Sequence, residues 1–246
     1  IVRATGMDSV TTLTFSGVGT NPPRISGLED RDLIVNAILD STNYWASHVI
    51  SSSGALTVNL EGDPTQVALQ QKSDNDFDLQ ASTDQDVTIN VGPYVSASGT
   101  YNFMNSLSSI NVSVDSTSIF GSHIQANEAE TISIVGGGRI QATISGQDIK
   151  TINIDAASGS LAVGAASAET FNLNSQGNFS LADNTSRLSG IQTMAINIGN
   201  GTADLSGWTL GFQDMRNLTL SGDGSASTVL LNNISGGEST MDIVMS

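Results

Sequence analysis

A short phrase of one apolar, one small polar and one apolar residue recurs along the chain. Ile196-Asn197-Ile198 is an example, and the turn residues Gly199-Asn200-Gly201 follow it at once. Side chains alternate between the two faces of a strand, so the outer residues of the phrase share one face and the middle residue takes the other. The phrase therefore predicts a short strand with one buried and one solvated face. Its seven copies are Ile89-Asn90-Val91, Ile110-Asn111-Val112, Ile132-Ser133-Ile134, Ile152-Asn153-Ile154, Phe171-Asn172-Leu173, Ile196-Asn197-Ile198 and Leu218-Thr219-Leu220.

The spacing of these copies predicts a solenoid. Their first positions are 19 to 25 residues apart, and the mean period from Ile89 to Leu218 is 21.5 residues. Periods of this length are typical of repeat proteins, in which a repeat buries its apolar face only against its neighbours. We therefore expect an all-β parallel β-helix with rungs of about 21 residues, an Ile/Leu/Phe column inside and an Asn/Ser/Thr ladder outside. A β-sandwich of antiparallel hairpins is the alternative. Its strands alternate in direction, so it gives no reason for the same phrase to recur at regular intervals along the chain.

The residues between the copies predict a second strand in each rung. Short apolar alternations at 140–144, 161–163, 179–181 and 229–231 follow the phrases, and glycine turns such as Gly136 to Gly138 separate the two. Each coil should thus have two or three faces.

The N-terminal region has a different pattern. Ser26 and Glu29 resemble a capping box, and an apolar stripe from Leu33 to Val49 has helical spacing, so we expect a helix over 28–50. Residues 1–60 would then form a cap with this helix and one early strand at 57–60, and residues 61–246 would form the β-solenoid. A helical cap would cover the open end of the apolar core.

Charge narrows the choice of partners. The chain has 8 Lys and Arg against 24 Asp and Glu, a net charge of −16, which argues against a nucleic-acid partner and favours cations such as calcium. It has no cysteine, and no apolar run approaches the roughly 20 residues of a membrane-spanning helix. Because residue 1 is Ile and no signal peptide is evident, we expect a fragment or a processed product.

One acidic stretch is a candidate metal site. Asp74, Asp76 and Asp78 have D-x-D-x-D spacing, and Asp84 and Asp86 could add ligands. Carboxylate oxygens are the ligands that calcium prefers, so we predict calcium as the cofactor here. The spacing does not match an EF-hand, and a polar loop or a solvated strand is the alternative.

Catalytic motifs are not found in the sequence. The two histidines, His48 and His123, are 75 positions apart, and neither a zinc-protease motif nor a nucleophile elbow occurs. We therefore expect that the protein is not an enzyme.

A longer version of the repeated phrase carries a family resemblance. LSGIQTMAINI at 188–198, NEAETISIV at 127–135, GQDIKTINI at 146–154 and SAETFNL at 167–173 resemble the recurrent phrase of bacterial surface-layer proteins and related large RTX-linked exported proteins. The resemblance implies an extracellular, calcium-dependent β-solenoid, exported by a type I system and assembled as a lattice or displayed as an adhesin. The glycine-aspartate nonapeptide of RTX calcium rolls is absent, and GNGTAD at 199–204 only approaches it.

These observations predict a structural protein of a bacterial cell-surface layer or surface filament. It would associate with copies of itself or with other cell-surface components through its solenoid faces, with help from calcium. An adhesin or glycan-binding solenoid is the alternative, and a β-helix carbohydrate-active enzyme would need an acidic groove that the sequence does not show.

Overall fold

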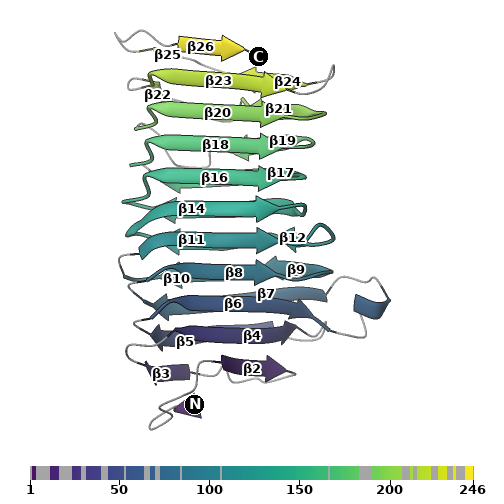
Figure 1. Cartoon of the computed structure of the whole chain (residues 1–246), viewed down its shortest axis with the longest axis vertical. Helices are drawn as coiled ribbons and strands as arrows, with labels where there is room; N and C mark the ends of the chain where they lie inside the picture. Colours follow the sequence, from purple (N-terminus) through teal and green to yellow (C-terminus); the bar gives the residue numbers. More distant parts are fainter. Residues whose placement is uncertain are drawn as a thin grey trace.

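The chain forms a stack of parallel β-strands, seen here in a computed structural model (Figure 1). The structure describes residues 2–3, 12–16, 24–28, 32–39, 44–52, 54–63, 67–69, 73–83, 85–105, 107–165, 167–182, 190–206, 211–212, 215–222, 227–231, 235–236 and 242–245. Among them, the one helical piece is a turn at 67–68. The predicted parallel β-helix is confirmed.

Two long parallel sheets contain most of the strands of the described residues. The 13-stranded sheet contains β1 (Val2–Arg3), β3 (Arg24–Leu28), β5 (Tyr44–Ser52), β7 (Ser73–Ser82), β9 (Val95–Ser98), β10 (Thr100–Phe103), β12 (Ile119–Phe120), β13 (His123–Ala126), β15 (Arg139–Gly146), β17 (Ser158–Ala165), β19 (Phe179–Ala182), β21 (Thr202–Leu205) and β24 (Thr228–Leu231). The 11-stranded sheet contains β2 (Thr12–Ser16), β4 (Leu33–Leu39), β6 (Leu56–Gly62), β8 (Val87–Val91), β11 (Leu107–Val114), β14 (Ala129–Gly136), β16 (Thr151–Ala156), β18 (Thr170–Ser175), β20 (Thr193–Ile198), β23 (Asn217–Gly222) and β26 (Asp242–Met245). A small third sheet pairs β22 (Gly211–Phe212) with β25 (Ser235–Gly236).

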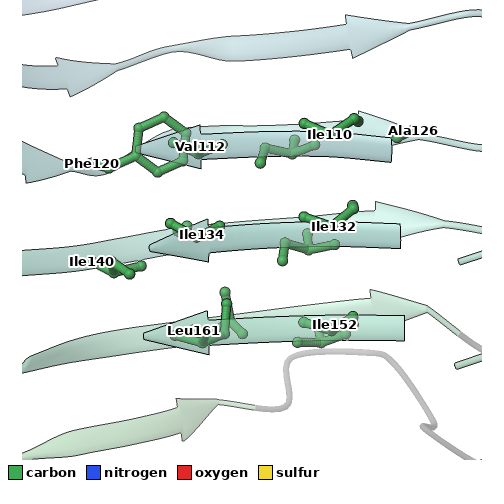
Figure 2. Close-up of a cluster of buried hydrophobic side chains, with 14 of the residues drawn as sticks. Ile110, Val112, Phe120, Ala126, Ile132, Ile134, Ile140, Ile152 and Leu161 are labelled. Carbon is green, nitrogen blue, oxygen red and sulfur yellow. The ribbon is translucent and has the colours of Figure 1, made fainter. Parts of the chain in front are cut away.

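The core lies between the two long sheets and consists of stacked apolar side chains (Figure 2). In β16, Ile152 and Ile154 are buried while Thr151 and Asn153 point outward, as the alternating pattern predicts. Ile152 stacks on Ile132 of the coil before it. Burying such a side chain is worth about 1.5–3 kcal/mol relative to exposure, and one coil alone could not bury it, so neighbouring coils stabilise each other.

The stacking register departs from the predicted one at two phrases. Ile110 pairs with Val87, and Ile196 pairs with Leu173, so the phrases that begin at Ile89 and Ile196 are displaced by two residues from the others. A shift of two positions keeps every side chain on its face, and the alternation therefore cannot detect it. With the true register, coils from Val87 to Leu218 are 19 to 24 residues long.

The second strand of each coil also lies where the sequence predicts it. The alternations at 140–144, 161–163, 179–181 and 229–231 fall within β15, β17, β19 and β24 of the 13-stranded sheet. In two earlier coils this strand is divided into β9 and β10 and into β12 and β13, with Gly99 in the left-handed region at the first division.

The predicted N-terminal helix is wrong. The described residues of 28–50 form strands instead, chiefly β4 and β5. Leu33, Val35 and Ala37 are buried, whereas the residues between them face outward, which is the period of two that a strand requires. β-Branched Ile and Val also favour strands over helices.

The early coils join the same stack as the later ones. The predicted strand at 57–60 lies in β6, which pairs with β4 on one side and β8 on the other, so Val58 lies between Val35 and Ile89. Of the proposed capping box, Ser26 lies in β3 and Glu29 lies outside the described residues. Asp32, directly before β4, accepts a hydrogen bond from the main-chain N–H of Ala55 in the next coil, at 3.0 Å.

Candidate functional surfaces

Of the five predicted metal ligands, four lie in the described residues, three of them in one long sheet and one beside the other. Asp74, Asp76 and Asp78 occupy alternate positions of β7, and Asp86 directly precedes β8 in the opposite sheet. Asp84 lies outside the described residues, and for Asp74 and Asp76 the structure describes the backbone alone.

The two aspartates with described side chains each accept a hydrogen bond from a residue of the next coil. Oδ1 of Asp78 accepts a hydrogen bond from the main-chain N–H of Thr100 at 2.7 Å, and Oδ1 of Asp86 accepts one from the Ser109 hydroxyl at 3.0 Å. Within the described residues, no three His, Cys, Asp or Glu side chains lie together as metal ligands. Calcium binding by the five aspartates therefore stays a prediction.

The two histidines lie on different strands of the 13-stranded sheet. His48 is in β5, where its backbone pairs with Leu79 of β7. His123 is in β13, and its Nε2 lies 2.9 Å from the Ser145 hydroxyl of the next coil. Partial burial lowers the pKa of His123, which favours its neutral form. These positions place His123 in a side-chain hydrogen bond between two coils.

The central strands of the 13-stranded sheet contain no acidic residue, and Arg139 of β15 is an exposed, positively charged side chain among them. No Asp or Glu occurs in β9, β10, β12, β13, β15, β17 or β19, although acids stand in β7 before them and in β21 after them. The outward positions of β17 are Ser158, Ser160, Ala162 and Gly164, all with short side chains. We call the outer surface of these seven strands the acid-free face.

The outer face of the 11-stranded sheet has hydrogen-bonded columns of polar side chains. In one column, Asn36, Asn59 and Asn90 follow one another, and each donates from Nδ2 to the side chain before it. Further along the same column, Asn174 donates to Asp155 and Asn197 donates to Asn174, at 2.9 and 2.8 Å. These contacts confirm the predicted outer ladder.

A second column runs beside the first. Asn153 donates to the Ser133 hydroxyl at 3.2 Å, and Asn172 donates to Oδ1 of Asn153 at 2.8 Å. The next position of this column is Ala195, which has no polar side chain. A groove of about 390 Å³ lies at this point between the two columns.

A larger hollow of about 700 Å³ lies at the edge where β14, β16 and β18 begin. Four carboxylates, those of Glu128, Glu130, Asp148 and Glu169, surround it with Lys150. Nζ of Lys150 lies 2.7 Å from Oε1 of Glu130, and both side chains are more than half exposed. This hydrogen bond lowers the pKa of Glu130 and raises that of Lys150.

Another hollow of about 490 Å³ lies on the edge of the 13-stranded sheet beside Arg139 and Asp204. Hydrogen bonds from the hydroxyl and main-chain N–H of Ser206 lower the pKa of Asp204 and keep it charged.

Sequence reasoning missed the acid-free face and the groove. The groove depends on which residues of different coils lie side by side, and only the correct register shows that. The composition of β9 to β19 did contain a signal, since seven strands without an acid are unusual in so acidic a chain.

Comparisons with known proteins found no relative of the chain. No family model, no curated protein and no solved structure matches the chain. In the part of the chain that the structure describes, no helix has the length and apolar character needed to cross a membrane.

Proposed function

We propose that the protein is a structural, self-associating module of a bacterial cell-surface layer or surface filament. Copies of the chain, or other components of the same surface, are its partners. The observation that carries this proposal is the acid-free face. The resemblance of the longer phrase to surface-layer and RTX-linked proteins supports the extracellular location.

Charge repulsion decides which surfaces of two copies can meet. At a net charge of −16, two molecules repel each other wherever acidic surfaces face one another. Across β9 to β19 that repulsion is weakest, because these strands contain no carboxylate. Copies therefore approach through the acid-free face, as like charges across an interface are costly.

The shape and regularity of this face favour extended packing. Ser160 lies between Gln141 and Ser180 in one outward column, and Ala162 lies beside Thr143 in the next. The short outward side chains of β17 allow a second sheet to approach closely. Because coils repeat at about 4.8 Å along the stack, a contact made by one coil is repeated by the next.

Calcium assists assembly in this proposal by neutralising the acidic surfaces outside the acid-free face. The chain carries 24 acidic residues against 8 basic ones, so divalent cations reduce its self-repulsion. This effect requires no single chelating site.

The test is to place a carboxylate on the acid-free face. We expect the wild-type chain to form larger species with calcium in light scattering after size exclusion and in electron microscopy. Ser160→Glu should abolish them, whereas Thr170→Glu, which makes the same charge change on the outer face of the opposite sheet, should not. Equal behaviour of the two variants, or a wild-type chain that stays monomeric with and without calcium, would reject the proposal.

An adhesin or glycan-binding module is the second candidate function. The groove between the two asparagine columns favours it, and this groove supports a separate inference.

A further inference from the structure

The groove on the outer face of the 11-stranded sheet lies where the regular columns are interrupted. Its walls are the side chains of Asn153 and Asn172 on one side and of Asp155, Asn174 and Asn197 on the other. The gap arises because Ala195 occupies the position that asparagine holds in the two preceding coils. An outward methyl group leaves the space that an amide would fill.

The floor of the groove consists mainly of backbone. Ile154, Leu173 and Ile196 line it, and their side chains are 1–2% exposed because they point into the core. Val135 stands at one end of the groove and is 43% exposed. A ligand would thus meet polar walls and one apolar contact.

The asparagine amides are held in place but keep hydrogen-bonding capacity. A side-chain amide has two N–H donors and an oxygen with two lone pairs. Each contact along a column, such as that from Asn172 to Asn153 at 2.8 Å, uses one donor and one lone pair. The remaining donors and lone pairs can bind a ligand. This binding costs little side-chain entropy, because the hydrogen bonds along the columns already fix the asparagine rotamers.

Size and charge together indicate the ligand. The volume of about 390 Å³ lies in the range of small-molecule sites, and the walls have no aromatic anchor of the kind that dominates protein interfaces. A net charge of −16 and the Asp155 carboxylate oppose an acidic polymer. A ligand with many hydroxyls and no charge fits best, because amides and carboxylates pair with neighbouring hydroxyls.

We propose that this groove binds a short neutral oligosaccharide that lies along the axis of the stack. Hydroxyls of successive sugar rings bond to amides of successive coils, which repeat at about 4.8 Å. Val135 contacts the C–H face of a ring. This inference is independent of self-association, since the groove and the acid-free face lie on opposite sheets.

The test uses the whole chain, at a concentration where it is monomeric, with cellotriose, maltotriose and chitotriose as neutral probes and trigalacturonic acid as the charged probe. Binding is followed by NMR through the side-chain amide signals of asparagine. We expect millimolar or tighter binding of at least one neutral probe, with shifts confined to the groove.

The variant that fills the groove is Ala195→Asn, which continues the column of Asn153 and Asn172. It should weaken binding at least tenfold while its circular dichroism spectrum and melting temperature stay at or above wild-type values. Thr193→Asn, on the same strand but outside the groove, should bind as the wild type does. Preferential binding of trigalacturonic acid, no binding of a neutral probe, or equal binding by both variants would overturn the inference.

Discussion

Asn172 donates a hydrogen bond from Nδ2 to Oδ1 of Asn153, 2.8 Å away in the preceding coil. The same direction recurs at other asparagines of the two columns, as Asn59 donates to Asn36, whereas Asn111 donates to Ser109 of its own strand. A hydrogen bond of this kind is worth about 0.5–1.5 kcal/mol net. The columns therefore add a second link between coils beside the main-chain hydrogen bonds.

Replacing Asn172 tests this link. Asn172→Ala removes the donor to Asn153, and we expect the free energy of unfolding to fall by about 1 kcal/mol. Urea unfolding followed by circular dichroism measures the change. The control is Thr170→Ala on the same strand and the same face, which should cost less. If Thr170→Ala lowers the free energy of unfolding as much as Asn172→Ala does, the loss comes from strand propensity. The hydrogen-bonded column would then add no stability.

The sequence predicted the β-helix well because its core pattern is strong. Ile132, Ile134, Ile152 and Ile154 are buried in adjacent strands that pair in the predicted order. Alternation fixes the face of each residue, and the repeat fixes which strands are neighbours. The alternation is a local pattern and the repeat is a periodic one, so both can be recognised in a single sequence.

The exact register could not be read from the three-residue phrase. In β20, Met194-Ala195-Ile196-Asn197-Ile198 contains two overlapping phrases, and the strand pairs through the first of them. The longer phrase resolves the choice, because Thr151, Thr170 and Thr193 lie side by side in β16, β18 and β20. An outward threonine before the first apolar residue thus marks the register of β20, but not that of β8, where Thr88 precedes Ile89 although the strand pairs through Val87.

The N-terminal error has a related physical cause. A run such as Leu33 to Leu39 is apolar at nearly every position, so residues with helical spacing can be selected from it as easily as residues with a period of two. Pairing with β6 decides the outcome, since Val35 packs beside Val58 in the same sheet. Tertiary contacts of this kind override local propensity.

A glycine at the turn between β14 and β15 provides a second prediction. Gly136 has a φ of +141°, and a Cβ added to it would overlap the carbonyl oxygen of Val114 in the preceding coil. Gly136→Ala should therefore destabilise the chain by about 1–3 kcal/mol, because both the backbone conformation and the close approach of two coils favour glycine. Differential scanning fluorimetry and urea unfolding measure the loss.

The matched control for Gly136 is Gly121. An added Cβ there would meet the carbonyl oxygen of Ala97 at 3.3 Å, which a small shift relieves, and its φ is not in the left-handed region. We expect Gly121→Ala to cost well under half as much. Similar losses in the two variants would show that the close approach at Val114 is not what the turn depends on.

The ion pair between Glu130 and Lys150 gives a pH-dependent prediction. Lys150 lowers the pKa of Glu130 below its ordinary 4.5 through a hydrogen bond of 2.7 Å and charge attraction. A lowered carboxyl pKa adds stability that is fully present above the ordinary value and is lost as the pH falls through the lowered one. Lys150→Met should return the Glu130 pKa toward 4.5, as measured by NMR titration of its side-chain carboxyl carbon.

The free energy of unfolding should depend on the ionisation of the same two residues. The difference in the free energy of unfolding between wild type and Lys150→Met should be constant near neutral pH and shrink below the ordinary Glu pKa of 4.5. The raised pKa of Lys150 works in the opposite sense, so the difference should also shrink as the pH rises past the ordinary 10.5 of lysine. Arg139→Met removes an equal charge from the opposite sheet and should leave the titration of Glu130 unchanged. A Glu130 pKa that does not respond to Lys150→Met, or that responds equally to Arg139→Met, would mean that the net charge of the chain, and not this contact between coils, sets its ionisation.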